Sequence, residues 1–151
     1  MTESELRYKI HLAIPKPVIK SGHKAEFVSG IIGRAIESTT ECTGEELCKI
    51  FYRLKYAEQF TYAHYAMFES SNKQHMAMLN ACYDAGEKYT TYNEKLRREV
   101  PNMEALGRWI QSKKSPVKKP LALMSKTELT RMIVAFRNVS KFSRRNERYE
   151  Y

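Results

Sequence analysis

The sequence repeats the residue pattern that starts an α-helix. In a capping box, a Ser or Thr hydroxyl accepts a hydrogen bond from the backbone amide three residues later, and a Glu or Gln there bonds back. The pattern occurs four times, at Thr2–Glu5, Thr43–Glu46, Ser71–Gln74 and Ser125–Glu128. Each copy precedes apolar residues at the spacing of an amphipathic helix. The sequence therefore predicts an all-α fold.

Residues 6–14 fit two structures. Leu6, Ile10 and Ile14 have the spacing of a helix face, but apolar residues also alternate through this segment as they would in a strand. The Thr2 capping box favours a helix, which Pro15 and Pro17 would end. A second helix is expected over residues 23–38.

The centre of the chain predicts two long helices, over residues 45–69 and from Ser71 to about residue 100. Leu47, Ile50 and Leu54 form an apolar stripe on the first. Apolar residues of the second recur at steps of four and three, at Met78, Cys82, Ala85, Tyr89, Tyr92 and Leu96. The short polar break between them favours a long antiparallel helical hairpin at the core of a small helical bundle. Self-association could use this hairpin.

The last third of the chain differs from the rest. Residues 102–111 predict a short helix with Trp109, the only tryptophan, and residues 112–120 form a basic linker with two prolines. A final helix starts at Ser125. A chain of 151 residues is about one domain long. We expect a single domain, with a near-neutral helical scaffold over residues 1–100 and a basic linker and C-terminal helix over residues 101–151.

Positive charge is concentrated in that last third. The chain has 26 Lys and Arg against 17 Asp and Glu, for a net charge of +9. Residues 1–70 are neutral and residues 71–100 carry +1, whereas residues 101–151 contain twelve basic and four acidic side chains, for +8. A local excess of this size points to a polyanionic partner.

The basic residues also follow a helical pattern. Arg137, Lys141, Arg144 and Arg148 would share one face of a continuous helix, and Arg131 and Arg145 a second face. The linker adds Lys113, Lys114, Lys118 and Lys119. Such side chains bind the phosphates of a nucleic acid without recognising its bases. We expect sequence-tolerant binding of DNA or RNA by an accessory protein, such as a phage or mobile-element protein or a subunit of a nucleoprotein complex.

A protein-interaction module is the alternative function. An inhibitor, adaptor or assembly subunit could dock the same charges on an acidic protein surface. Seven of the ten tyrosines lie on the expected hairpin, where core or interface packing is their common role. Tyr62 and Tyr83 fall off the apolar stripes, so they are candidates for stacking on unpaired bases.

The sequence offers no catalytic motif, so we expect no enzyme, metal or cofactor. His64 and His75 flank the predicted hairpin break near Glu69 and could form a metal or acid–base site, although core packing or solvent exposure is the simpler explanation. The three cysteines lack paired spacing and are expected to be reduced thiols. With no secretory signal or membrane-spanning apolar run, a cytoplasmic protein is expected.

Overall fold

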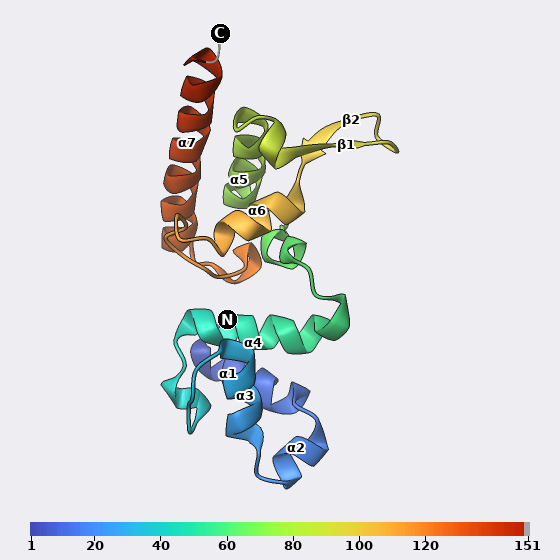
Figure 1. The fold of residues 1–151 in the computed structure, drawn as a ribbon, viewed down its shortest axis with the longest axis vertical. Coiled ribbons are helices and arrows are strands. Elements are labelled where there is room, and N and C mark those ends of the chain that lie inside the picture. The colour runs from blue at the N-terminus through green and yellow to red at the C-terminus, as the bar shows by residue number, and fades with distance from the viewer. Residues whose placement is uncertain (150–151) are drawn as a thin grey trace. The chain divides into compact units, whose positions relative to one another are not determined.

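A computed structural model describes residues 1–149, and the side chains of residues 1–139. Contacts divide the chain into two compact units, Met1–Phe60 and Thr61–Tyr151. The described residues are mostly helical, with one small sheet of two strands (Figure 1). The mainly helical class is therefore confirmed. The expected division of one domain near residue 100 rests on charge and stays a prediction.

The N-terminal unit is built on its longest helix, α4. Both α1 and α3 pack against α4 (Figure 1). Ile10, Val28, Leu47 and Ile50 are fully buried between these helices. The elements of the unit are α1 (Glu3–Ala13), α2 (Lys16–Lys20), α3 (Lys24–Ile32), η1 (Thr39–Glu41), α4 (Gly44–Tyr56) and η2 (Ala57–Gln59), where η marks a 3-10 helix.

Two predicted capping sites start helices in this unit. The Thr2 hydroxyl accepts the Glu5 amide at 3.2 Å, so residues 6–14 begin as a helix and not as a strand. At α4 the box is complete, because the Glu46 amide donates to the Thr43 hydroxyl at 3.2 Å and the Thr43 amide donates to the Glu46 carboxylate at 3.0 Å. Helix α3 ends earlier than expected, at Ile32, because the next residue, Gly33, has a left-handed φ of +77°.

Glu46 also forms the main ion pair of the unit. Arg34 donates from Nε to Oε2 at 2.7 Å and from Nη2 to Oε1 at 2.8 Å, a two-point contact. Arg34 Nη2 also donates to the Glu41 carbonyl at 2.8 Å. The Arg34 hydrogen bonds are the main cause that lowers the pKa of Glu46 from 4.5 to about 2. This pair fastens the segment after α3 to the first turn of α4.

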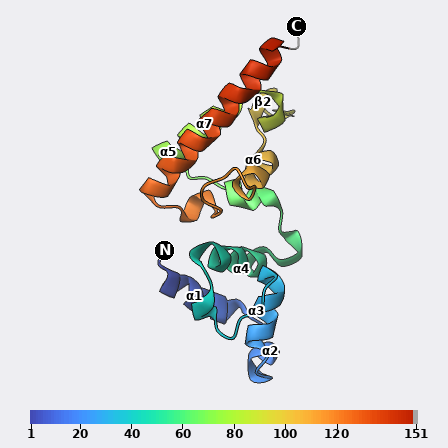
Figure 2. The same cartoon turned by 60° about the vertical axis from the view of Figure 1, so that its left-hand side comes forward.

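The C-terminal unit is built around α5 and α7, which pack against each other; they lie side by side in Figure 1, and α7 crosses in front of α5 in Figure 2. Gln74 Nε2 donates to the Lys126 carbonyl and to the Thr130 hydroxyl, each at 3.0 Å, so the two helices begin together. The elements are η3 (Tyr62–Ala66), α5 (Lys73–Asp84), η4 (Glu87–Tyr89), β1 (Thr90–Asn93), β2 (Arg98–Pro101), α6 (Met103–Ile110), η5 (Leu121–Leu123) and α7 (Lys126–Tyr149).

Phe136 of α7 lies at the aromatic centre of this unit. The rings of Tyr89 and Trp109 meet it edge-on, with centroid distances of 5.0 Å each. Leu129 and Met132 are buried on the same side of α7, as the periodicity predicted. The predicted Ser125 box is also confirmed, because its hydroxyl accepts the Glu128 amide at 3.2 Å.

The long antiparallel helical hairpin is not confirmed. Helix α4 ends at Tyr56 because Ala57 adopts a left-handed φ of +47°, which no α-helix can continue through. The next residues fold back, so that the Arg53 guanidinium lies 4.1 Å from the centre of the Phe60 ring. Residues 57–66 then form two 3-10 helices in place of the last turns of the expected helix.

The second expected helix also stops early, and a β-hairpin replaces its end. Helix α5 starts one residue later than predicted, with Asn72 as its cap, and ends at Asp84 before Gly86 at a φ of +89°. Strands β1 and β2 then pair antiparallel, with Asn93 opposite Arg98. Tyr89 keeps its predicted buried position, whereas Leu96 is exposed in the turn.

Helix α6 and η3 approach so closely that only glycine fits at their contact. A Cβ atom added to Gly107 would overlap the backbone carbonyl of Tyr62 and press on the Ala63 nitrogen. The contact ties the first element of the C-terminal unit to the helix that carries Trp109.

We expect Gly107→Ala to destabilise the C-terminal unit by at least about 1 kcal/mol, because steric overlap with backbone outweighs the gain in helix propensity. Urea unfolding followed by Trp109 fluorescence measures this directly, since Trp109 is the only tryptophan. Gly30→Ala is the matched control, because no atom lies within 4 Å of its added Cβ. It should leave the Trp109 transition in place. An unshifted midpoint for Gly107→Ala would contradict the close contact.

We expect Glu46→Gln to destabilise the N-terminal unit by about 1 kcal/mol at neutral pH, a value already reduced for solvent screening. Because the pKa of Glu46 is lowered in the folded protein, its charged form stabilises the fold. This contribution to the free energy of unfolding is complete above pH 4.5 and disappears as the pH falls toward 2. The gap between variant and parent should therefore close in acid. Thermal unfolding followed by circular dichroism, at neutral pH and near pH 2, tests this. Glu58→Gln, an exposed carboxylate of the same unit, should change neither melt.

Candidate functional site

The basic linker, residues 112–120, and α7 form a joint surface in the C-terminal unit. Lys119 Nζ lies 2.9 Å from the Glu128 carboxylate, and the buried Ser115 hydroxyl lies 3.4 Å from the Met132 sulfur. Pro116 of the loop and Arg131 of α7 line one shallow hollow. The basic loop and the start of the arginine-bearing helix are thus neighbours in space.

Six of the ten predicted nucleic-acid contacts have side chains that the structure describes, and two of these six have structural partners. Lys118 Nζ donates to the Ser115 carbonyl at 3.2 Å, and Lys119 is paired with Glu128. Both lysines are only partly exposed. These contacts hold the loop in place, so Lys118 and Lys119 have less freedom to meet a partner than the sequence suggested.

Four predicted contacts are exposed side chains, and we call these four residues the basic surface. Within the described residues none of them has an acidic partner. They are Lys113, Lys114, Arg131 and Arg137.

The remaining four predicted contacts lie farther along α7, which continues to Tyr149. Their positions belong to one helix with Arg137, but their side chains lie outside the part that the structure describes. They are Lys141, Arg144, Arg145 and Arg148.

The two candidate stacking tyrosines have different surroundings. Tyr62 is half-buried, and the Arg108 guanidinium carbon lies 5.0 Å from its ring centre, so a cation already occupies one ring face. Tyr83 is 44% exposed on α5 and lines a pocket. Tyr83 is therefore the more accessible of the two rings for stacking.

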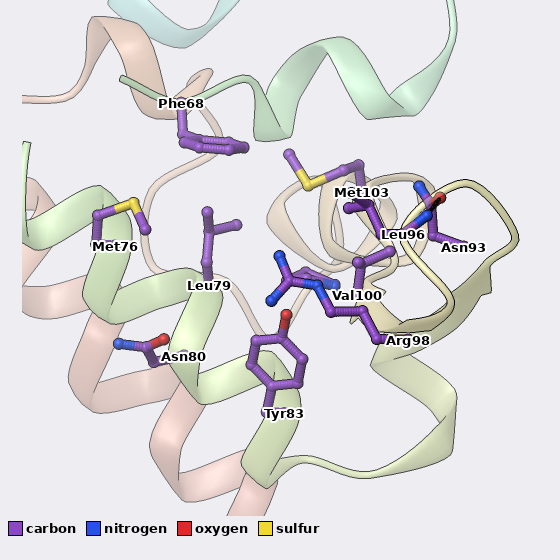
Figure 3. A pocket seen from close by; sticks show the side chains of 11 residues that line it. Phe68, Met76, Leu79, Asn80, Tyr83, Asn93, Leu96, Arg98, Val100 and Met103 are labelled. Carbon is purple, nitrogen blue, oxygen red and sulfur yellow. Dashed lines mark hydrogen bonds between the residues drawn. The ribbon is translucent and has the colours of Figure 1, made fainter. Parts of the chain in front are cut away.

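That pocket was missed by the sequence analysis, because it depends on the unexpected β-hairpin. It has a volume of about 630 Å³ and lies among α5, the hairpin and the start of α6 (Figure 3). Met76, Leu79, Asn80 and Tyr83 face it from α5, one helical turn after another. The sequence signal for the hairpin was Thr90–Tyr92, a run of strand-favouring residues after a glycine.

Arg98 extends into this pocket from β2 toward α5 (Figure 3). It is exposed, and the described residues offer its guanidinium no acidic partner. Among the lining residues it alone carries a formal charge. The pocket therefore joins an apolar floor to one available cation.

His75 has a structural role that the sequence left open. It is 1% exposed, and its Nδ1 accepts the Glu69 amide at 3.1 Å while Nε2 donates to the Leu121 carbonyl at 3.0 Å. His64 instead bonds the backbone of Thr61 from its own 3-10 helix. Across the described residues, no three His, Cys, Asp or Glu side chains gather as a metal site requires.

The cysteines are buried thiols. Burial raises the pKa of Cys82 to about 12, and it also raises the pKa of Cys42. A thiol with a raised pKa supplies little of the thiolate that nucleophilic chemistry needs at neutral pH.

No protein family, curated protein or solved structure matches this chain in comparisons with known proteins. Within residues 1–149, none of the helices has the length and apolar character that crossing a membrane requires. Function must therefore be inferred from the charges, contacts and exposed side chains described above.

We expect His75→Phe to destabilise the C-terminal unit by about 1–3 kcal/mol, because it leaves a buried carbonyl and a partly buried amide without partners. Urea unfolding followed by Trp109 fluorescence measures the loss. His11→Phe, at an exposed position of α1, is the control and should leave that transition unchanged. Equal midpoints for His75→Phe and the parent would show that the two hydrogen bonds contribute nothing.

Proposed function

We propose that this protein is a non-enzymatic nucleic-acid-binding accessory protein. It contacts phosphates through the basic surface and the basic residues farther along α7. The observation that carries the proposal is the charge of +8 within residues 101–151. Phosphate contacts of this kind dominate sequence-tolerant binding to DNA and RNA.

Among the described residues of this segment, ion pairing leaves several basic side chains available. Among the acids of residues 101–151, Glu104 pairs with Arg108 at 3.2 Å and Glu128 pairs with Lys119 at 2.9 Å. Lys113, Lys114 and Arg131 are exposed and take part in neither pair. A phosphate can therefore approach them without breaking a described salt bridge.

The backbone of α7 supports a common binding face. Arg137, Lys141, Arg144 and Arg148 stand at steps of four, three and four, and α7 runs without interruption from Lys126 to Tyr149. Residues at these steps share one side of an α-helix. Lys and Arg contacts to phosphate fix the position of a protein on nucleic acid without specifying bases, so we expect binding to many sequences.

An acidic protein surface is the competing partner for the same charges. Complementary charge speeds association with either partner, so charge alone does not separate them. The spacing of phosphates along a strand is regular, whereas carboxylates on a folded protein are scattered. A direct comparison of the two polyanions therefore decides between them.

We expect binding to labelled oligonucleotides to weaken steeply with salt, with a slope in log K against log salt of about −0.7 per phosphate contact on single strands and −0.9 on duplex. Changing the basic surface to Glu should weaken binding at least tenfold and flatten the slope. Fluorescence anisotropy at several salt concentrations measures both. The control is an equal number of reversals at exposed lysines of the N-terminal unit, at Lys9, Lys16, Lys20 and Lys55.

This control lowers the net charge by the same amount, so a specific surface predicts a much smaller loss for it. Two competitors, unlabelled nucleic acid and polyglutamate, are then added separately to the complex of the protein with a labelled single strand. Displacement by polyglutamate at lower charge concentration than by unlabelled nucleic acid would favour an acidic protein partner. Binding that ignores both salt and the reversal of the basic surface would refute the proposal.

A further inference from the structure

Exposed apolar side chains gather around the pocket between α5 and the β-hairpin. Phe68, Tyr83 and Leu96 are 43%, 44% and 55% exposed, and all three line it (Figure 3). Its volume of about 630 Å³ lies in the usual range of ligand-binding pockets. Scattered exposed apolar residues are ordinary, but several around one hollow mark a binding surface.

One wall of the pocket is firmly held. Leu79 is 5% exposed at the pocket floor, and α5, which carries it, packs along α7. His75 fixes the first turn of α5 through its bonds to Glu69 and Leu121. The Tyr83 and Leu79 side chains therefore present a surface that exists before any partner arrives.

The opposite wall supplies the charge. Alternation along β2 places Arg98 and Val100 on one face of the hairpin, and Asn93, directly opposite Arg98 in the register, also lines the pocket. The Arg98 guanidinium offers several donors in a fork that suits a carboxylate. None of the lining residues that the structure describes is acidic.

We propose that this pocket binds a peptide segment of a partner protein that carries a bulky apolar side chain next to a carboxylate. The apolar side chain rests on Leu79 and Phe68, and the carboxylate meets Arg98. The Asn80 amide and the Nδ2 group of Asn93, whose Oδ1 already accepts the Leu96 amide, can pair with the peptide backbone of the partner. This site is separate from the basic surface, because none of the four residues of that surface is among the described residues that line it.

The lining favours a protein partner over a free small acid. Aromatic residues, Met and Arg are the residue types enriched in protein interfaces, and the pocket contains Phe68, Met76, Met103, Tyr83 and Arg98. Methionine side chains also adapt to partners of different shape. A single available arginine matches one carboxylate and not a chain of phosphates.

The test is a selection from a phage-displayed library of random twelve-residue peptides on the full-length protein, at a salt concentration that suppresses binding to the basic surface. We expect enriched peptides to place Asp or Glu within a few residues of Phe, Leu or Trp. Synthetic copies of these peptides should bind the parent protein, and Arg98→Glu should weaken their binding at least tenfold. Phe68→Ser should also weaken peptide binding.

Lys95→Glu is the matched control, because Lys95 is an exposed cation of the same hairpin that does not line the pocket. It should change peptide affinity less than twofold, and so should reversal of the basic surface. Trp109 fluorescence unfolding verifies that each variant is folded. Enriched peptides without the acidic–apolar pattern, or affinities unaffected by Arg98→Glu, would overturn the proposal. Binding of decanoate or indole acetate at this site without any peptide binding would overturn it in favour of a small acid.

Discussion

The C-terminal unit depends on one buried histidine. His75 joins α5 to the residues just before it and to a segment 46 residues later, because its two ring nitrogens bond the backbone at Glu69 and Leu121 while its own backbone belongs to α5. A buried side chain that satisfies two backbone groups is costly to replace. Through these bonds α5 is set against the loop that leads into α7. The pocket wall and the basic surface are therefore both positioned from the same residue.

Local chemistry could be predicted from the sequence wherever a cap and an apolar stripe agreed. Thr2, Thr43 and Ser125 start helices as expected, and the short helix with Trp109 is present as α6. The failures have tertiary causes. The apolar spacing continues past Ala57 and past Ala85, but there Tyr65 and Tyr89 are buried from 3-10 helices, and Leu96 is exposed on the β-hairpin. Periodicity alone does not distinguish these structures from α-helix.

The candidate sites were predictable to different degrees. Charge counting located the basic segment, since charge depends on composition, and it could not reveal that Lys118 and Lys119 have structural partners. The pocket could not be found from sequence, because Arg98 and Tyr83 meet only when the hairpin folds beside α5. For His75 the outcome is the opposite. Its residue type made it a candidate for a metal or acid–base site, whereas the structure shows it buried and hydrogen-bonded to two backbone segments.

The pocket has one stiff wall and one compliant wall. Helix α5 is anchored along its length by α7, whereas β1 and β2 form a sheet of only two strands, an arrangement that is marginally stable by itself. The base of the hairpin is held by Tyr89, which packs against Phe136, so small movements of its tip would widen or narrow the space above Leu79 without disturbing that core. For the proposed peptide ligand, such a pocket would select mainly for a carboxylate that pairs with Arg98 and would tolerate variation in the size of the apolar group. It would then suit a family of related sequences better than one fixed ligand.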